Sequence, residues 1–121
     1  MDLIGITIFG GVNIQPPPPP PEFYLWSWGS NSSGKLGLGD TTNRSSPVQI
    51  GALTTWLSTA AGGYHGMAIK ADGTLWTWGN NSDGRLGLGN TTNRSSPVQL
   101  GSLTNWLSVS AGGYSSQAIS N

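Results

Sequence analysis

The feature that most constrains this chain is a tandem repeat with a period of 50 residues. The segment LWSWGSNSSGKLGLGD at residues 25–40 returns as LWTWGNNSDGRLGLGN at residues 75–90, and the likeness extends over residues 25–71 and 75–121. About two thirds of the aligned positions are identical. A repeat of this length is typical of solenoids and propellers, in which each unit buries its apolar face against its neighbours. The sequence therefore predicts an array of similar units.

Composition indicates the secondary structure of the array. The 121 residues include 19 glycines and 8 prolines, and only 8% are charged, which favours turn-rich β structure over helices. The formal net charge is +0, so nucleic acid and anionic membranes are poor candidates as partners. The chain has no cysteine, which excludes disulfides and thiolate metal sites within it.

Within each repeat, apolar and small residues follow the spacing of short strands. Residues 66–70 and 74–78 flank an Asp-Gly pair at 72–73, a favoured hairpin turn, and we expect them to pair as antiparallel strands. The segments at 56–63 and 106–113 each predict a further strand that ends in two glycines, where close backbone packing is expected. Three or four short strands per repeat predict an all-β fold built from propeller-type blades.

The first 15 residues differ from the repeats. Ile4, Ile6 and Ile8 alternate with other residues up to a Gly-Gly turn at 10–11, which predicts a short strand. The segment lacks the basic start and cleavage site of a signal peptide. Its apolar stretch is far shorter than the roughly 20 residues that a membrane-spanning helix needs. We interpret residues 1–15 as a docking strand in which the three isoleucines contact a partner.

Six consecutive prolines, Pro16–Pro21, follow the predicted strand. Proline has a fixed φ and no amide donor, so the run cannot join a sheet and instead forms a polyproline II rod. We expect residues 16–22 to be a rigid linker. The alternative is that the run is a ligand for a protein with an aromatic-lined groove.

The sequence GGYHGMAIKADGTLWTWGNNSDGRLGLG, residues 62–89, combines a His-x-x-Ala-Ile core, an Asp-Gly turn, a Trp-Gly pair and a Gly-x-Leu-Gly-x-Gly loop. This combination resembles the repeats of the regulator of chromosome condensation family, whose members form β-propellers, and the near-identical copies look like those of bacterial and bacteriophage proteins. The resemblance covers residues 25–121. It implies two tandem repeats, 23–72 and 73–121, the second incomplete. Because a closed propeller needs about 4–8 blades, we expect the repeats to belong to a larger propeller, made by a longer chain or by other copies.

Most of the distinctive residues have structural explanations. We expect a structural core made of Trp26, Trp28, Trp76, Trp78 and His65. The residues expected to shape the loops are Gly37, Gly39, Gly87 and Gly89. The only histidine is replaced by Ser115 in the second repeat, and the resemblance implies that it packs within a blade.

No catalytic, cofactor-binding or metal-binding residues are expected. The serines have no second histidine to activate them, and no acidic pair offers acid–base chemistry. The segment NSDGRLGLGN lacks the lysine and Ser/Thr ending of a phosphate-binding loop. The loops at 31–46 and 81–96 are polar, and we expect no exposed aromatic platform on them.

These observations and the resemblance lead to three functional hypotheses. The first is a non-enzymatic structural protein of a virus particle, a bacteriophage tail or fibre component that is made in the host cytoplasm and located in the virion. Its partners would be other virion structural proteins and further copies of itself, as a homo-oligomer or multi-copy assembly. The second is an adhesin that binds a host surface receptor through the propeller loops. The last is an exchange factor for a small GTPase; the resemblance implies that this activity needs a wedge-like insertion, and none interrupts the 50-residue period.

Overall fold

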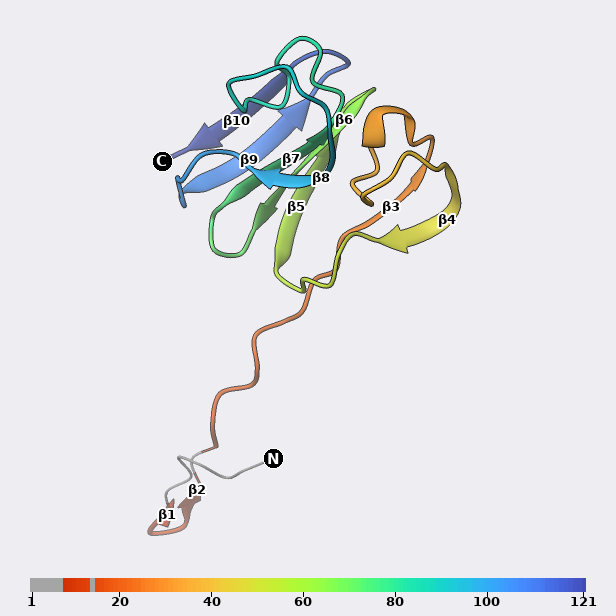
Figure 1. The fold of residues 1–121 in the computed structure, drawn as a ribbon. Coiled ribbons are helices and arrows are strands. Elements are labelled where there is room, and N and C mark those ends of the chain that lie inside the picture. The colour runs from red at the N-terminus through yellow and green to blue at the C-terminus, as the bar shows by residue number, and fades with distance from the viewer. Residues whose placement is uncertain (1–7, 14) are drawn as a thin grey trace.

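The computed structural model describes residues 8–13 and 15–121 and is an all-β structure. Figure 1 shows the strands of the repeats gathered into neighbouring sheets, with residues 15–22 leading away from them. The first repeat contributes β3 (Trp26–Gly29), the short 3-10 helix η1 (Ser32–Gly34), β4 (Arg44–Gln49), β5 (Trp56–Ala61) and β6 (His65–Lys70). The second contributes β7 (Leu75–Gly79), β8 (Arg94–Gln99), β9 (Trp106–Ala111) and β10 (Ser116–Ser120).

The central sheet has four antiparallel strands in the order β5-β6-β7-β8. The predicted hairpin across the Asp-Gly turn is confirmed, with Gly66 opposite Trp78 and Ile69 opposite Leu75. The strands predicted near residues 56 and 106 are confirmed as β5 and β9. Strand β4 begins at Arg44 and includes Pro47.

The sheets do not coincide with the sequence repeats. The four-stranded sheet, here called the complete blade, takes β5 and β6 from the first repeat and β7 and β8 from the second. The pair β3–β4 forms an N-terminal half-blade, and the pair β9–β10 forms a C-terminal half-blade. The two half-blades match different halves of the complete blade, because β3–β4 repeats the sequence of β7–β8 and β9–β10 repeats that of β5–β6.

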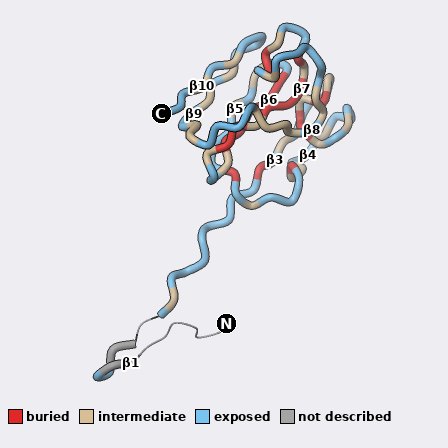
Figure 2. The backbone as a smooth tube through the Cα atoms, turned by 60° about the vertical axis from the view of Figure 1, so that its left-hand side comes forward, coloured by how far each residue is buried: buried red, intermediate tan, exposed pale blue. Residues whose placement is uncertain are grey.

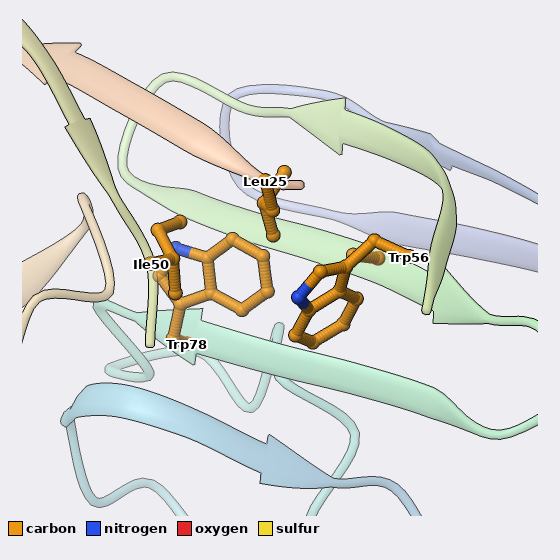
Figure 3. Close-up of a cluster of buried hydrophobic side chains, with 5 residues drawn as sticks. Leu25, Ile50, Trp56 and Trp78 are labelled. Atoms are coloured by element: carbon orange, nitrogen blue, oxygen red, sulfur yellow. The ribbon is translucent and has the colours of Figure 1, made fainter. Parts of the chain in front are cut away.

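The complete blade buries both of its faces. One cluster joins it to the N-terminal half-blade; Figure 3 shows four of its members, Leu25, Ile50, Trp56 and Trp78, converging on one another. The other cluster is formed by Met67, Ile69 and Leu75, and partly buried side chains of the C-terminal half-blade cover it. In Figure 2 the buried backbone accordingly concentrates in β6 and β7. Successive side chains point to opposite faces of a strand, so alternate residues of β7 enter different clusters.

The predicted tryptophan core is only partly correct. Trp78 is 3% exposed, and Trp76 is partly buried against the same cluster. Trp26 and Trp28, in contrast, are 49% and 59% exposed, so their assignment to the core was wrong for this structure. The reason is that β3 pairs only with β4 among the described residues, whereas β7 also has β6 beside it.

The four predicted loop glycines all adopt positive φ angles, between 72° and 82°. A side chain is strained in this backbone region, which explains why glycine occurs at these turns in both repeats. Gly37 has a second constraint, because a Cβ there would lie 2.9 Å from the indole nitrogen of Trp78.

The N-terminal segment contains a small hairpin. β1 (Ile8–Phe9) pairs with β2 (Val12–Asn13) across the Gly-Gly turn, so this strand has a partner within its own segment, contrary to the expectation that its partner lies elsewhere. Ile8 belongs to β1, whereas Ile4 and Ile6 lie outside the described residues. Residues 15–22 have no regular secondary structure. A docking role for the isoleucines and a spacer role for the prolines stay predictions. In the described part of the chain, no helix has the length and apolar character needed to cross a membrane.

Candidate protein-interaction site

A buried asparagine fixes the conformation of each long blade loop. Asn81 is fully buried; its side-chain amide donates to the carbonyl oxygens of Asn90 and Thr92, at 2.9 and 3.0 Å, and its Oδ1 accepts from the Leu86 amide at 3.0 Å. Asn31 makes the equivalent contacts in the first repeat. Because one side chain satisfies three backbone groups, each loop is held in a single shape.

These loops place a cation against the next blade. Lys35 Nζ donates to the Gly63 carbonyl oxygen at 3.3 Å, and Arg85 Nη1 donates to the Gly113 carbonyl oxygen at 3.2 Å. Arg85 also forms an ion pair with Asp83, with 2.6 Å between Nη2 and Oδ2. Lys35 and Arg85 are 50 residues apart, and each connects its loop to the following hairpin turn by the same kind of hydrogen bond.

The two hairpin turns that receive these cations pack directly on each other. A Cβ added to Gly62 would lie 2.5 Å from the carbonyl oxygen of Gly112, and one added to Gly63 would lie 3.6 Å from the Cα of Gly113. Gly62 therefore permits a backbone approach that a larger residue would prevent, whereas a Cβ on Gly63 would make an ordinary contact. This confirms the close packing that we expected after β5 and β9.

The close approach brings two tyrosines together at the surface. The ring centroids of Tyr64 and Tyr114 are 5.6 Å apart with an interplanar angle of 34°. The guanidinium carbon of Arg85 lies 5.6 Å from the Tyr64 centroid and 5.0 Å from the Tyr114 centroid, and Lys35 Nζ lies 5.6 Å from that of Tyr64. We call these four residues the tyrosine ladder. Tyr64 and Tyr114 remain 42% and 65% exposed, so their rings are accessible to a partner.

The tyrosine ladder is an aromatic surface outside the long loops, on which we expected no aromatic platform. That expectation considered only the long polar loops, whereas the tyrosines come from the short turns before β6 and β10. The signal in the sequence is the Gly-Gly-Tyr triplet, present at residues 62–64 and again at 112–114. Tyrosine and arginine are enriched among the residues that dominate protein–protein binding energies.

His65 joins the complete blade to the C-terminal half-blade. It is 1% exposed, and its Nε2 lies 2.7 Å from Ser116 Oγ, which itself donates to the Arg85 carbonyl oxygen at 2.7 Å. Since the Ser116 hydroxyl donates to the Arg85 carbonyl oxygen, the short contact with His65 has the histidine donating from Nε2 to Ser116 Oγ. Burial lowers the pKa of His65 below its usual 6.5, and the Arg85 guanidinium lowers it further. Among the described residues, no group of three or more His, Asp or Glu side chains could hold a metal ion.

Comparison with known proteins identifies the architecture. A family model described as the regulator of chromosome condensation (RCC1) repeat matches residues 24–69 and 72–119, and a second model of the same description matches residues 56–85. The chain belongs to this repeat family. The RCC1 propeller-blade fold predicted from the sequence is thereby supported, and the positions of the two matches agree with the 50-residue period.

Similar proteins occur in plants, yeast and humans. A curated relative, the RCC1 domain-containing protein RUG3, mitochondrial, from Arabidopsis thaliana, is 39% identical over 54 residues, which is 43% of this chain and 12% of the relative. The structure of human WBSCR16 matches with a TM-score of 0.70 and 26% identity, over 82% of this chain and 26% of that one. Prp20p from Saccharomyces cerevisiae matches with a TM-score of 0.64 and 23% identity, over 82% and 26% of the two chains. The chain thus spans about a quarter of these solved chains.

These relatives overturn two expectations. The matching proteins are a plant mitochondrial protein and human and yeast RCC1-type proteins, so the assignments to a virus particle and to the virion were wrong. A bacteriophage type of repeat is not supported either. The near-identical sequences of the two repeats have a structural explanation that does not depend on the organism. Each repeat uses the same buried asparagine, positive-φ glycines and bridging cation.

Proposed function

We propose that this chain is a protein-binding stretch of an RCC1-type propeller, which acts by contact and not by catalysis. The observation that carries the proposal is the tyrosine ladder, in which rigid loops and stacked glycine turns hold two exposed aromatic rings beside two cations. Preorganised aromatic side chains lose little conformational entropy on binding and are therefore effective contact residues. The neutral buried histidine offers no acid–base group at this surface.

The related proteins support a protein as the partner class. One matching structure shows Kap60 bound to yeast RCC1 (Prp20), and another is described with the binding of Prp20p to Gsp1p and histones. These partners belong to the yeast protein, whose likeness to this chain concerns the fold. The formal net charge of +0 agrees with a protein partner better than with bare nucleic acid.

The ladder also indicates what a partner would present. Arg85 is already paired with Asp83 and buried, so its role is to hold the two rings. Lys35 uses one donor on Gly63 and has two further N–H groups. A partner segment with an apolar or proline side chain for the tyrosines and a carboxylate near Lys35 would fit this surface.

A capture experiment with matched variants tests the proposal. The immobilised chain, a Tyr64→Ala/Tyr114→Ala variant and a Tyr24→Ala control would be exposed to extract from the source cells, and bound proteins would be quantified by mass spectrometry. Tyr24 is an equally suitable exposed tyrosine outside the ladder, where it donates to Glu22. We expect at least one protein to bind the chain and the control equally and to fall by about tenfold or more with the double variant, the loss typical of a binding hot spot. Equal binding by all three forms would contradict the proposal.

Regulation of a small GTPase is a second candidate, because the related solved structures include the yeast RCC1 protein described with its binding to Gsp1p. From the sequence alone this hypothesis ranked last of the three, and the related proteins give it more support. Release of a fluorescent nucleotide from a panel of small GTPases, with and without the chain, would test it. Faster nucleotide release with the chain, but not with the Tyr64→Ala/Tyr114→Ala variant, would favour exchange activity. Unchanged release across the panel would contradict this second candidate function.

A further inference from the structure

Two sheet edges of the chain match each other in backbone pattern. Among the described residues, β3 pairs only with β4 and β10 pairs only with β9. Inside the complete blade, the strand equivalent to β10, which is β6, pairs with the strand equivalent to β3, which is β7. A second copy could therefore add its β3 to the edge of β10 by strand addition, and repetition would give a ring or a filament.

The side chains at this edge oppose such pairing. Gly66 lies opposite Trp78 in the complete blade, and a Cβ on Gly66 would lie 2.5 Å from the indole ring. Ser116 replaces this glycine in β10, in the same register, since Ser116 pairs with Ala111 as Gly66 pairs with Ala61. The indole of Trp28 from a second copy would meet the Ser116 Cβ at a distance that atoms do not tolerate.

The hydrogen bonds give an independent reason. The indole Nε1 of Trp78 donates to the Lys35 carbonyl oxygen at 2.9 Å. The equivalent acceptor for an incoming tryptophan is the Arg85 carbonyl oxygen, and Ser116 Oγ already donates to it at 2.7 Å. The same Oγ accepts from His65, so Ser116 occupies both the space and the acceptor that the indole would need.

We propose that Ser116 prevents the chain from associating head to tail through β10 and β3. The strand that fits beside β10 has a small side chain opposite Ser116, and the tryptophan-bearing β3 of another copy does not fit there. This inference concerns the assembly of blades and is independent of the tyrosine ladder. The multi-copy assembly expected from the sequence then does not form through these edges.

The test converts β10 into a strand of the β6 type. A Ser115→His/Ser116→Gly/Gln117→Met variant restores the residues found at 65–67, whereas a Ser115→His/Gln117→Met variant keeps the serine. In sedimentation velocity over a range of concentrations, we expect that neither the unmodified chain nor the double variant associates through these edges. The triple variant should associate at least about tenfold more tightly, because glycine removes the steric clash. Adding Trp28→Ala to the triple variant should abolish that association.

Two controls keep the result decisive. Ser116→Ala loses the same hydrogen bonds as Ser116→Gly but retains the Cβ, so it should remain unassociated if the clash is what matters. Far-ultraviolet circular dichroism would establish that each variant is folded. A folded triple variant that does not associate would overturn the proposal. Association of the unmodified chain that Trp28→Ala abolishes would overturn it as well.

Discussion

At the residue scale, His65 joins the complete blade to the C-terminal half-blade through its bond to Ser116. Its pKa is lowered in the folded state, chiefly by burial, so folding favours the neutral ring. The unfolded chain binds a proton near pH 6.5, and the contribution of His65 to stability is therefore complete above that pH and is lost as the pH falls below it. We expect the free energy of unfolding, measured by denaturant titration, to decrease between pH 7 and pH 5 by at most about 1.4 kcal/mol per pH unit.

A His65→Ser variant is the control for this pH dependence, because serine occupies the equivalent position 115. The carboxyl groups of Asp40 and Asp72 do not interfere, since hydrogen bonds lower the pKa of both below 3.8. The variant should have a stability that is nearly constant from pH 7 to pH 5. An unchanged slope in the variant would show that another group is responsible.

Gly62 is a second decisive residue, because its Cα faces the Gly112 carbonyl oxygen and the His65 ring. A Gly62→Ala substitution should destabilise the chain by about 1–3 kcal/mol, the typical cost of inserting a methyl group where no space exists. Gly113→Ala is the matched control, since a Cβ there meets nothing within 4 Å. Thermal unfolding of both variants would measure the difference, and equal stabilities would contradict the close packing of the two turns.

At the element scale, β3 and β7 show that one sequence pattern can be buried or exposed. Their sequences, WSWG and LWTWG, share both tryptophans, but β7 has a strand on each side, whereas β3 pairs with β4 alone in the part of the chain that the structure describes. We expect Trp78→Ala to cost about 3–5 kcal/mol, as for other buried aromatic residues. Trp28→Ala should cost within about 0.5 kcal/mol, as for other surface positions. Chemical denaturation of the two variants compares them directly; similar losses would mean that β3 is covered in solution.

The strands and turns could be predicted from the sequence because their signals are local. The Asp-Gly turn and the glycines with positive φ act within a few residues, and both were located correctly. The burial of Trp26 and Trp28 could not be predicted in the same way, because it depends on which strand lies beside β3. The tyrosine ladder was missed for a related reason: its rings are 50 residues apart and meet only when two glycine turns pack together.

At the scale of the whole molecule, the offset between repeat and blade explains the arrangement of the chain. One repeat supplies the second half of one blade and the first half of the next, so each sheet depends on two repeats. The repeated loops then bridge successive blades through Lys35 and Arg85, and the tyrosines align along the same rim. A fixed, recurring aromatic surface of this kind suits an extended protein contact.

Amide hydrogen exchange on the chain bound to the protein recovered by capture tests this account most directly. The account predicts that binding slows exchange at the turns 62–64 and 112–114 and in the adjoining loop residues 82–87. The Asp-Gly turn at 72–73, at the other end of the β6–β7 hairpin, should exchange at an unchanged rate. Protection confined to that opposite turn, with none at the tyrosine ladder, would contradict the account.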